Sequence, residues 1–210
     1  MPDYLPTDIL CQAFVISSKV TPETLYRLND AFPKDSDWPQ EFKNYFNPVP
    51  RDLSQLPVPS KDPVDFVIEI VGGGDTKALM NISRDVYKQA VKDGYETSAA
   101  FVILDDRSVE DDTLLVYFLD YDIDEDDEDA EPKAHWRHWR VRFSDAYEMV
   151  RIFDTCEFVA IEGYILDVAE QYTGDDGIFE FGEAAKSHAG GVLGDEEEEV
   201  EEEDDEEKCD

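Results

Sequence analysis

Short runs of apolar, β-branched and aromatic residues recur along the chain and predict the strands of a sheet. The runs are QAFVI (12–16), VDFVIEIV (64–71), AFVIL (100–104) and LLVYFL (114–119). Their length and composition favour strands over helices. Only the polar stretch DDRSVEDDT separates the last two runs, so we expect these two strands to pair at the centre of the sheet.

A further run, WRHWRVRF (136–143), alternates between apolar and polar side chains. The apolar set is Trp139, Val141 and Phe143, and the polar set is His138, Arg140 and Arg142. Successive side chains in a strand point to opposite faces of a sheet. The run therefore predicts a strand with one buried face and one solvated, mainly basic face.

Residues that can cap a helix precede four stretches with helical periodicity. The caps and the helices that they predict are Thr21 with 22–32, Asp37 with 38–46, Ser83 with 84–92, and Ser144 with 145–153. The second helix should place four rings on one side, in the core: Trp38, Phe42, Tyr45 and Phe46. In the third, Val86, Tyr87, Ala90 and Val91 should share one face. A last helix is predicted over 162–171.

Prolines and glycines mark the segments between these elements. Five prolines fall within residues 47–63, which excludes a regular helix and predicts an extended connector. The folded part is expected to end near Phe181. Together the elements predict a single α+β domain over residues 1–181, with an antiparallel or mixed central sheet packed by helices. Residues 182–210 would follow it as a disordered tail.

Charge changes this picture most, because the 210 residues include 53 acidic and 18 basic side chains, a net charge of -35. Asp120–Glu131 holds nine acids and no base, and Asp195–Asp210 holds thirteen acids and one lysine. Like charges repel and bury nothing, so we expect an acidic loop over 120–132 and an acidic tail. Such a chain should avoid nucleic acid and anionic membranes, and should favour either no partner or a basic protein.

The N-terminal residues and the cysteines bear on the compartment. MPDYLPTDILCQAFVISSK lacks the basic start and apolar stretch of a secretory signal, which predicts a cytoplasmic or nuclear location. Cys11, Cys156 and Cys209 are odd in number and form no C-x-x-C motif, so we expect reduced thiols. No apolar run approaches the length of a membrane-spanning helix.

Known catalytic motifs are weak or missing in the sequence. VGGGDTK (71–77) has neither common phosphate-loop spacing, and no G-x-S-x-G occurs. His135 and His138 are three residues apart on a predicted strand, so their rings should point to opposite faces and share no metal ion. We therefore predict no catalytic residue, cofactor or metal site.

One polar cluster remains as a candidate ligand site, in which arginines and a carboxylate could orient a polar substrate. Its members are Asp106, Arg107, His138, Arg140 and Arg142. Asp106 and Arg107 could instead pair with each other to close a turn. The basic residues beside Trp136 and Trp139 resemble a single-stranded nucleic-acid surface, but with nine acids just upstream we expect them to pair with the acidic loop.

Four segments are similar to parts of a known family. They are AAFVILDDRSV (99–109), TLLVYFLDYD (113–122), WRVRF (139–143) and GYILDVAEQYTGDDGIFEF (163–181). The matching positions are Phe101, Asp106, Arg107, Ser108, Leu114, Leu115, Val116, Arg140 or Arg142, Val141, and Asp176 to Phe179. Over residues 64–181 the chain thus resembles a family of bacterial and fungal proteins defined only as a domain of unknown function. It departs from that family by the acidic insertion and by AIEG (160–163) in place of N-M-D-F. The resemblance implies a small α+β domain and no known activity.

Two functions from different classes follow from these observations. The first is a non-enzymatic interaction domain whose acidic loop and tail contact basic protein surfaces or maintain solubility. The second is a small ligand-binding domain or enzyme with a pocket near Asp106, Arg107, His138 and Arg142. Sequence patterning does not decide the oligomeric state.

Overall fold

A computed structural model describes residues 10–31, 45–52, 68–71, 75–93, 97–122, 133–154 and 168–192. Within these ranges, no helix is both long enough and apolar enough to cross a bilayer.

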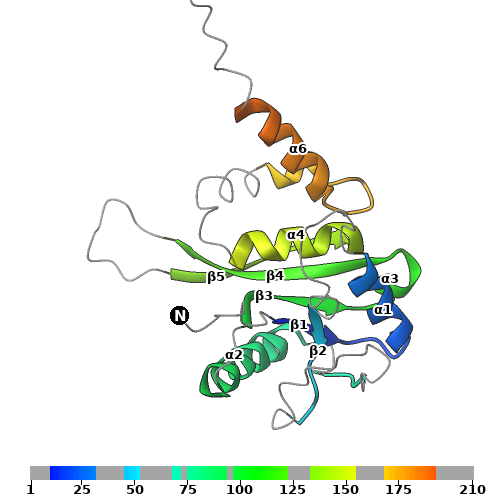
Figure 1. The fold of residues 1–210 in the computed structure, drawn as a ribbon, viewed down its shortest axis with the longest axis vertical. Coiled ribbons are helices and arrows are strands. Elements are labelled where there is room, and N and C mark those ends of the chain that lie inside the picture. Colours follow the sequence, from blue (N-terminus) through cyan, green and yellow to red (C-terminus); the bar gives the residue numbers. More distant parts are fainter. Residues whose placement is uncertain are drawn as a thin grey trace, which may run out of the picture.

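The centre of the molecule is a five-stranded mixed sheet (Figure 1). Its strands are β1 (Leu10–Val15), β2 (Phe46–Pro48), β3 (Thr97–Leu104), β4 (Thr113–Asp122) and β5 (Lys133–Arg142). Their order across the sheet is β2-β1-β3-β4-β5. β1 runs parallel to β2 and β3, whereas β3–β4 and β4–β5 are antiparallel. The α+β class is confirmed, with the sheet mixed rather than wholly antiparallel.

The pairing of β3 with β4 and β5 follows the sequence pattern. Val102 lies opposite Val116, and Val116 lies opposite Trp139, so one face of the three strands is apolar. Val141 is fully buried on that face, whereas His138 on the other face is exposed. The predicted central strand pair and the alternation along β5 are both confirmed.

Helices cover both faces of the sheet, because each face carries apolar side chains. α1 (Pro22–Asp30) and α4 (Phe143–Asp154) lie on one face, and α2 (Thr76–Asp93) lies on the other (Figure 1). The first layer buries Leu28 and Met149 with Val102 and Val116. The second layer packs mainly aromatic and aliphatic side chains, including Phe14, Phe101, Ile103, Leu79 and Val86.

Two short segments extend the sheet at its edges. Ile70 forms a parallel bridge with Val15, beyond the point where β2 ends. Ile178 forms a parallel bridge with Arg140 on the outer edge of β5, where the Phe179 N–H donates to the Arg140 carbonyl at 2.8 Å. Both edges are thus partly paired, which limits strand addition from other chains. Of the strand predicted over 64–71, residues 64–67 lie outside the described residues.

The helix predicted to start after Ser83 begins earlier. α2 runs from Thr76 to Asp93, and Ser83 is buried in its middle. Leu79 and Val86 are seven residues apart and face the sheet, so Tyr87, one residue further around the helix, turns outward. Tyr87 is 52% exposed, whereas Val86 is 3% exposed. The prediction that Val86 and Tyr87 share one face is therefore wrong.

The helix predicted after Thr21 is confirmed as α1, with Thr21 at its N-cap, whereas the remaining helix predictions need correction. Phe46 begins β2 rather than ending a helix, because its backbone pairs with that of Cys11. Tyr45 and Phe46 are nevertheless buried, as expected of core rings, while residues 38–44 lie outside the described residues. Ser144 is the second residue of α4, not its cap. Within 162–171, the described residues form the start of a short 3-10 helix, η6 (Ala169–Tyr172).

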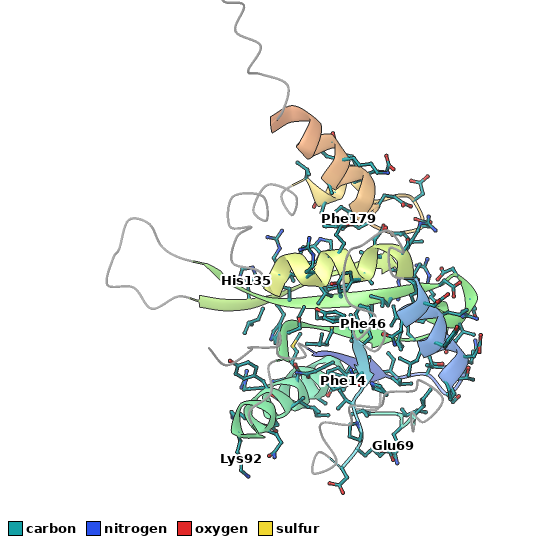
Figure 2. The ribbon with its side chains drawn as sticks, in the orientation of Figure 1. Phe14, Phe46, Glu69, Lys92, His135 and Phe179 are labelled. Carbon is teal, nitrogen blue, oxygen red and sulfur yellow. The ribbon has the colours of Figure 1, made fainter. Side chains whose placement is uncertain are left out.

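The C-terminal end of the folded part also differs from the expectation. Helix α6 spans Phe181–Val192, so regular structure continues past Phe181. Phe181 and Ala184 are buried in the same cluster as the residues of α4. In Figure 1 α6 follows α4 on the same side of the sheet, and Phe179 lies beneath its start in Figure 2. The acidic run Asp195–Asp210 lies outside the described residues.

Asn29 ties α1 to the edge strand β2. Its side-chain Nδ2 donates to the carbonyls of Leu25 at 3.1 Å and Phe46 at 3.3 Å, and its Oδ1 accepts from the Phe46 N–H at 3.0 Å. Asn29 is buried, with only 4% of the residue exposed to solvent. It thus satisfies both backbone polar groups of Phe46 on the side away from β1.

We expect Asn29→Ala to lower the free energy of unfolding by about 2 kcal/mol, because the buried N–H and carbonyl of Phe46 lose their partners. Urea unfolding followed by circular dichroism measures this change. Asp30→Ala alters the exposed neighbouring residue and should change stability by less than ~0.5 kcal/mol. Equal effects of the two substitutions would contradict the role of Asn29.

Candidate functional site

Polar side chains meet where β1 and β3 end side by side. The two strands are parallel, so their carboxyl ends, followed by Ser17 and by Asp106, lie at one edge of the sheet. The Ser17 hydroxyl donates to Asp106 Oδ1. Lys19 Nζ lies 2.9 Å from Asp106 Oδ2 and 3.0 Å from Glu110 Oε1. Ligands of open α/β sheets commonly bind at this edge, which makes the cluster the natural place to look for a site.

Asp105 and Arg140 form the least exposed ion pair among the described residues. Arg140 contacts both carboxylate oxygens of Asp105 and donates to Thr113 Oγ1 at 3.0 Å. The Arg140 and Asp105 side chains are only 10% and 21% exposed. Asp105 also caps the short helix α3 (Asp106–Glu110) by accepting from the Ser108 N–H at 3.2 Å. The pair thus joins β5 to the turn after β3.

Arg107 and Arg142 both contact the segment of residues 176–180. Arg107 Nη2 lies 2.7 Å from Asp111 Oδ2, and its Nη1 donates to the Asp176 carbonyl at 3.0 Å. Arg142 Nη2 donates to Glu180 Oε1 at 2.7 Å. Both arginines therefore fasten residues 176–180 against α3 and β5. Asp106 and Arg107 do not pair with each other to close a turn.

His138 lies apart from these ion pairs along the same strand face. Its ring stacks on Tyr117 at a centroid distance of 4.9 Å, and Tyr117 stacks in turn on Phe101. His135 is three residues away on a regular strand, so its side chain points to the opposite face. Within the described ranges, no group of three or more His, Cys, Asp or Glu residues could hold a metal ion.

Of the five residues of the predicted polar cluster, the structure brings Arg107 and Arg140 together at Asp111 and Thr113, whereas His138 lies apart. Asp106, Arg107, Arg140 and Arg142 each use their charge on a separate internal partner, and His138 uses its ring face for packing. Sequence reasoning missed Ser17, Lys19, Asp105 and Glu180 as their partners. The spacing of Asp105 and Ser108 is a visible capping signal, but nothing local indicates contacts across 35 or more residues.

The basic face of β5 is paired with residues other than those expected. Arg140 binds Asp105 and Arg142 binds Glu180, whereas we expected the acidic loop over 120–132 to be the partner. Arg137 lies over the Trp139 ring, 5.2 Å from its centroid. Residues 123–132 lie outside the described residues. Pairing of the acidic loop with basic residues at the start of β5 therefore stays a prediction.

The start of α2 follows the three glycines that suggested a phosphate loop. Gly72–Gly74 lie outside the described residues. Asp75 precedes the helix, and its Oδ1 accepts the Lys77 N–H at 3.0 Å. A carboxylate thus occupies one of the amide groups that would bind an anion at this helix end.

Asp106 and Lys19 shift each other's protonation in opposite directions. The hydrogen bond from Ser17, followed by that from Lys19, lowers the pKa of Asp106. The hydrogen bonds to Asp106 and Glu110 raise the pKa of Lys19. A lowered carboxyl pKa adds stability above the unfolded value, about 3.9 for Asp, and this stability is lost as the pH falls through the folded value.

We expect the stability difference between wild type and Lys19→Met to be constant from about pH 5 to pH 9 and to shrink below about pH 4. As the pH falls through the lowered pKa of Asp106, this carboxylate takes up a proton and the Lys19 ammonium loses a charged partner. Urea unfolding at a series of pH values measures the difference. Lys19→Arg keeps the charge and should retain most of the effect, and a pH-independent difference for Lys19→Met would contradict this assignment.

Comparison of the chain with protein-family models, with curated proteins and with solved structures found no match. The resemblance to a domain family of unknown function therefore stays a prediction.

Proposed function

We propose that the protein is a non-enzymatic interaction domain whose acidic runs, Asp120–Glu131 and Asp195–Asp210, contact basic protein surfaces. The proposed location is the cytoplasm or the nucleus, and the C-terminal acidic run is proposed to be a disordered tail. The proposal rests on how charge is divided between the folded framework and the rest of the chain.

The described residues are close to charge balance. They contain 14 Lys and Arg against 22 Asp and Glu, a net charge of -8 out of the -35 of the whole chain. The remaining residues hold the other 4 basic and 31 acidic side chains. Summed like charges attract opposite charge over about 8 Å at physiological salt. The acidic runs are therefore the parts of the chain best suited to bind a basic partner.

The alternative function, a ligand site near Asp106, Arg107, His138 and Arg142, has no comparable support. The charged groups of Asp106, Arg107 and Arg142 already contact internal partners at 2.7 to 2.9 Å. A polar ligand would have to displace these contacts before it could bind. We therefore favour a structural role for the cluster, which holds α3 and residues 176–180 onto the sheet.

The proposed function is tested by retention of the chain on an immobilised lysine-rich protein. We expect the full chain to be retained at about 0.05 M salt and released at about 0.5 M, because salt screens contacts between exposed charges. A chain in which every acid of Asp195–Asp210 becomes the corresponding amide keeps the same length and should be retained less. A second variant with the same change in Asp120–Glu131 measures the contribution of the internal run.

The control replaces exposed acids of the folded framework instead, Glu23 and Asp85, and should be retained like the unmodified chain. If the amide variants of both runs are retained as strongly as the unmodified chain, the acidic runs do not bind the partner. A loss of solubility without a loss of retention would then assign them to keeping the protein soluble.

A further inference from the structure

Helix α2 carries a basic stripe on the side away from the sheet. The stripe consists of Lys77, Arg84, Lys88 and Lys92, all exposed. At 100° per residue these four positions fall within one narrow sector, opposite the buried Leu79 and Val86. Lys92 is at the outer side of α2 in Figure 2. Tyr87, 52% exposed, borders the stripe.

The stripe is nearly unpaired, unlike the arginines of β5. Among the residues that the structure describes, none forms an ion pair with Lys77, Arg84 or Lys92. Lys88 has only a long contact, 3.9 Å, to Asp85. Arg84, Lys88 and Lys92 follow one another at four-residue spacing, where like charges on a helix repel. In a chain with 53 acids and 18 bases, four cations in this arrangement form an unusual surface that attracts an acidic segment.

We propose that the C-terminal part of the acidic run Asp195–Asp210 of the same chain docks on the basic stripe of α2. The run offers 13 carboxylates within 16 residues. From Lys77 to Lys92 the stripe extends about 22 Å along the helix axis, and the acidic run exceeds this length when extended.

The tail is long enough to reach α2 from its attachment point. α6 ends at Val192, which leaves 18 residues to the C-terminus. These can span up to about 60 Å. A folded body of this size is on the order of 40 Å across, so the first residues of the run bridge this distance and its last residues reach the stripe. Attachment to the same body raises the effective concentration of the tail to about the millimolar range. Weak ion pairs then suffice for docking.

Docking gives the interaction domain an internal competitor. This inference rests on the proposed function in one respect, since the segment that docks is also the one proposed to bind basic partners. A basic partner must displace the tail from α2 before it can bind the tail fully. Partner binding would therefore free the basic stripe, and removal of the stripe's charges would strengthen partner binding.

A nitroxide spin label on Cys209, which lies within the acidic run, tests the docking in the full chain. Cys11 is fully buried, and Cys156→Ser removes the other thiol. At about 0.02 M salt we expect the label to weaken the amide NMR signals of α2 near the stripe, and at about 0.5 M salt the signals should recover. The triple variant Lys77→Gln, Arg84→Gln, Lys92→Gln should abolish the weakening, whereas Lys186→Gln on α6 should not.

A second sample mixes spin-labelled chains without isotope enrichment and isotope-enriched chains without a spin label. In this mixture only contacts between different chains can weaken the amide signals. Weakening in the mixture would overturn docking within the same chain. Undiminished α2 signals in the labelled chain at low salt would overturn the proposal altogether, as would weakening that the triple variant leaves unchanged. None of these results involves a partner, so retention on the lysine-rich protein still tests the proposed function separately.

Discussion

Phe101→Ala should lower the free energy of unfolding by about 4 kcal/mol. Phe101 is fully buried in the central strand β3, between the sheet and α2. Its ring meets Phe14 edge-on at 5.2 Å, stacks on Tyr117 at 5.1 Å and contacts Trp136 at 5.1 Å. Alanine would leave a cavity that three large rings line, and rings of this size cannot all move in to fill it.

Urea unfolding followed by tryptophan fluorescence measures the loss, and Phe101→Leu should retain most of the stability because it fills most of the volume. Tyr26→Ala serves as the control, since Tyr26 is 49% exposed on α1 and should contribute less than ~0.5 kcal/mol. If Phe101→Ala cost no more than this control, the second core layer would not exist as described.

Arg140→Ala should lower the free energy of unfolding by about 3 kcal/mol, because it leaves the Asp105 carboxylate largely buried without its cation. It also removes the donor to Thr113 Oγ1, a hydroxyl in a fully buried residue. Arg142→Ala is a close control two residues along the same strand face. The Arg142–Glu180 pair is 46% and 38% exposed, and exposed pairs contribute at most about 1 kcal/mol.

The double variant Arg140→Met with Asp105→Asn should lose much less unfolding free energy than Arg140→Ala does. Asparagine caps helices about as well as aspartate, so α3 keeps its cap while the buried negative charge disappears. Chemical denaturation of Arg140→Met, of Asp105→Asn and of the double variant gives the coupling energy between Arg140 and Asp105. Equal losses for Arg140→Ala and Arg142→Ala would contradict the distinction between a buried and an exposed pair.

The strands β1, β3, β4 and β5 were predictable because the burial of a strand shows in its own sequence, whereas β2 begins where the pattern predicts a helix. The alternation in β5 and the apolar runs of β3 and β4 come from neighbours two residues apart, whichever partner strand they meet. Helix boundaries were less predictable. Ser83 and Ser144 look like caps, but a serine is also tolerated inside a helix when tertiary packing supports it, as in the buried middle of α2 and the first turn of α4.

The candidate site was predictable only as a set of residue types. Asp106, Arg107, Arg140 and Arg142 are recognisable as charged residues near strand ends, yet their partners are Lys19, Asp111, Asp105 and Glu180. Three of these four pairs join residues far apart in the chain. A charged residue pairs with an opposite charge that the fold brings near it, and the local sequence pattern does not indicate which residue that is.

The sequence by itself determined that this protein has an apolar sheet, an excess of negative charge concentrated in two runs, and a basic strand face. Periodicity and charge density are local properties, and they can be counted without knowing the fold. Only the tertiary structure decided that Arg140 and Arg142 of β5 are paired internally, while three of the four exposed cations of α2 form no ion pair with another described residue and the fourth, Lys88, has only the 3.9 Å contact to Asp85. The physical reason is that an ion pair requires atoms within about 4 Å, and such distances between remote residues exist only once the strands have taken their order.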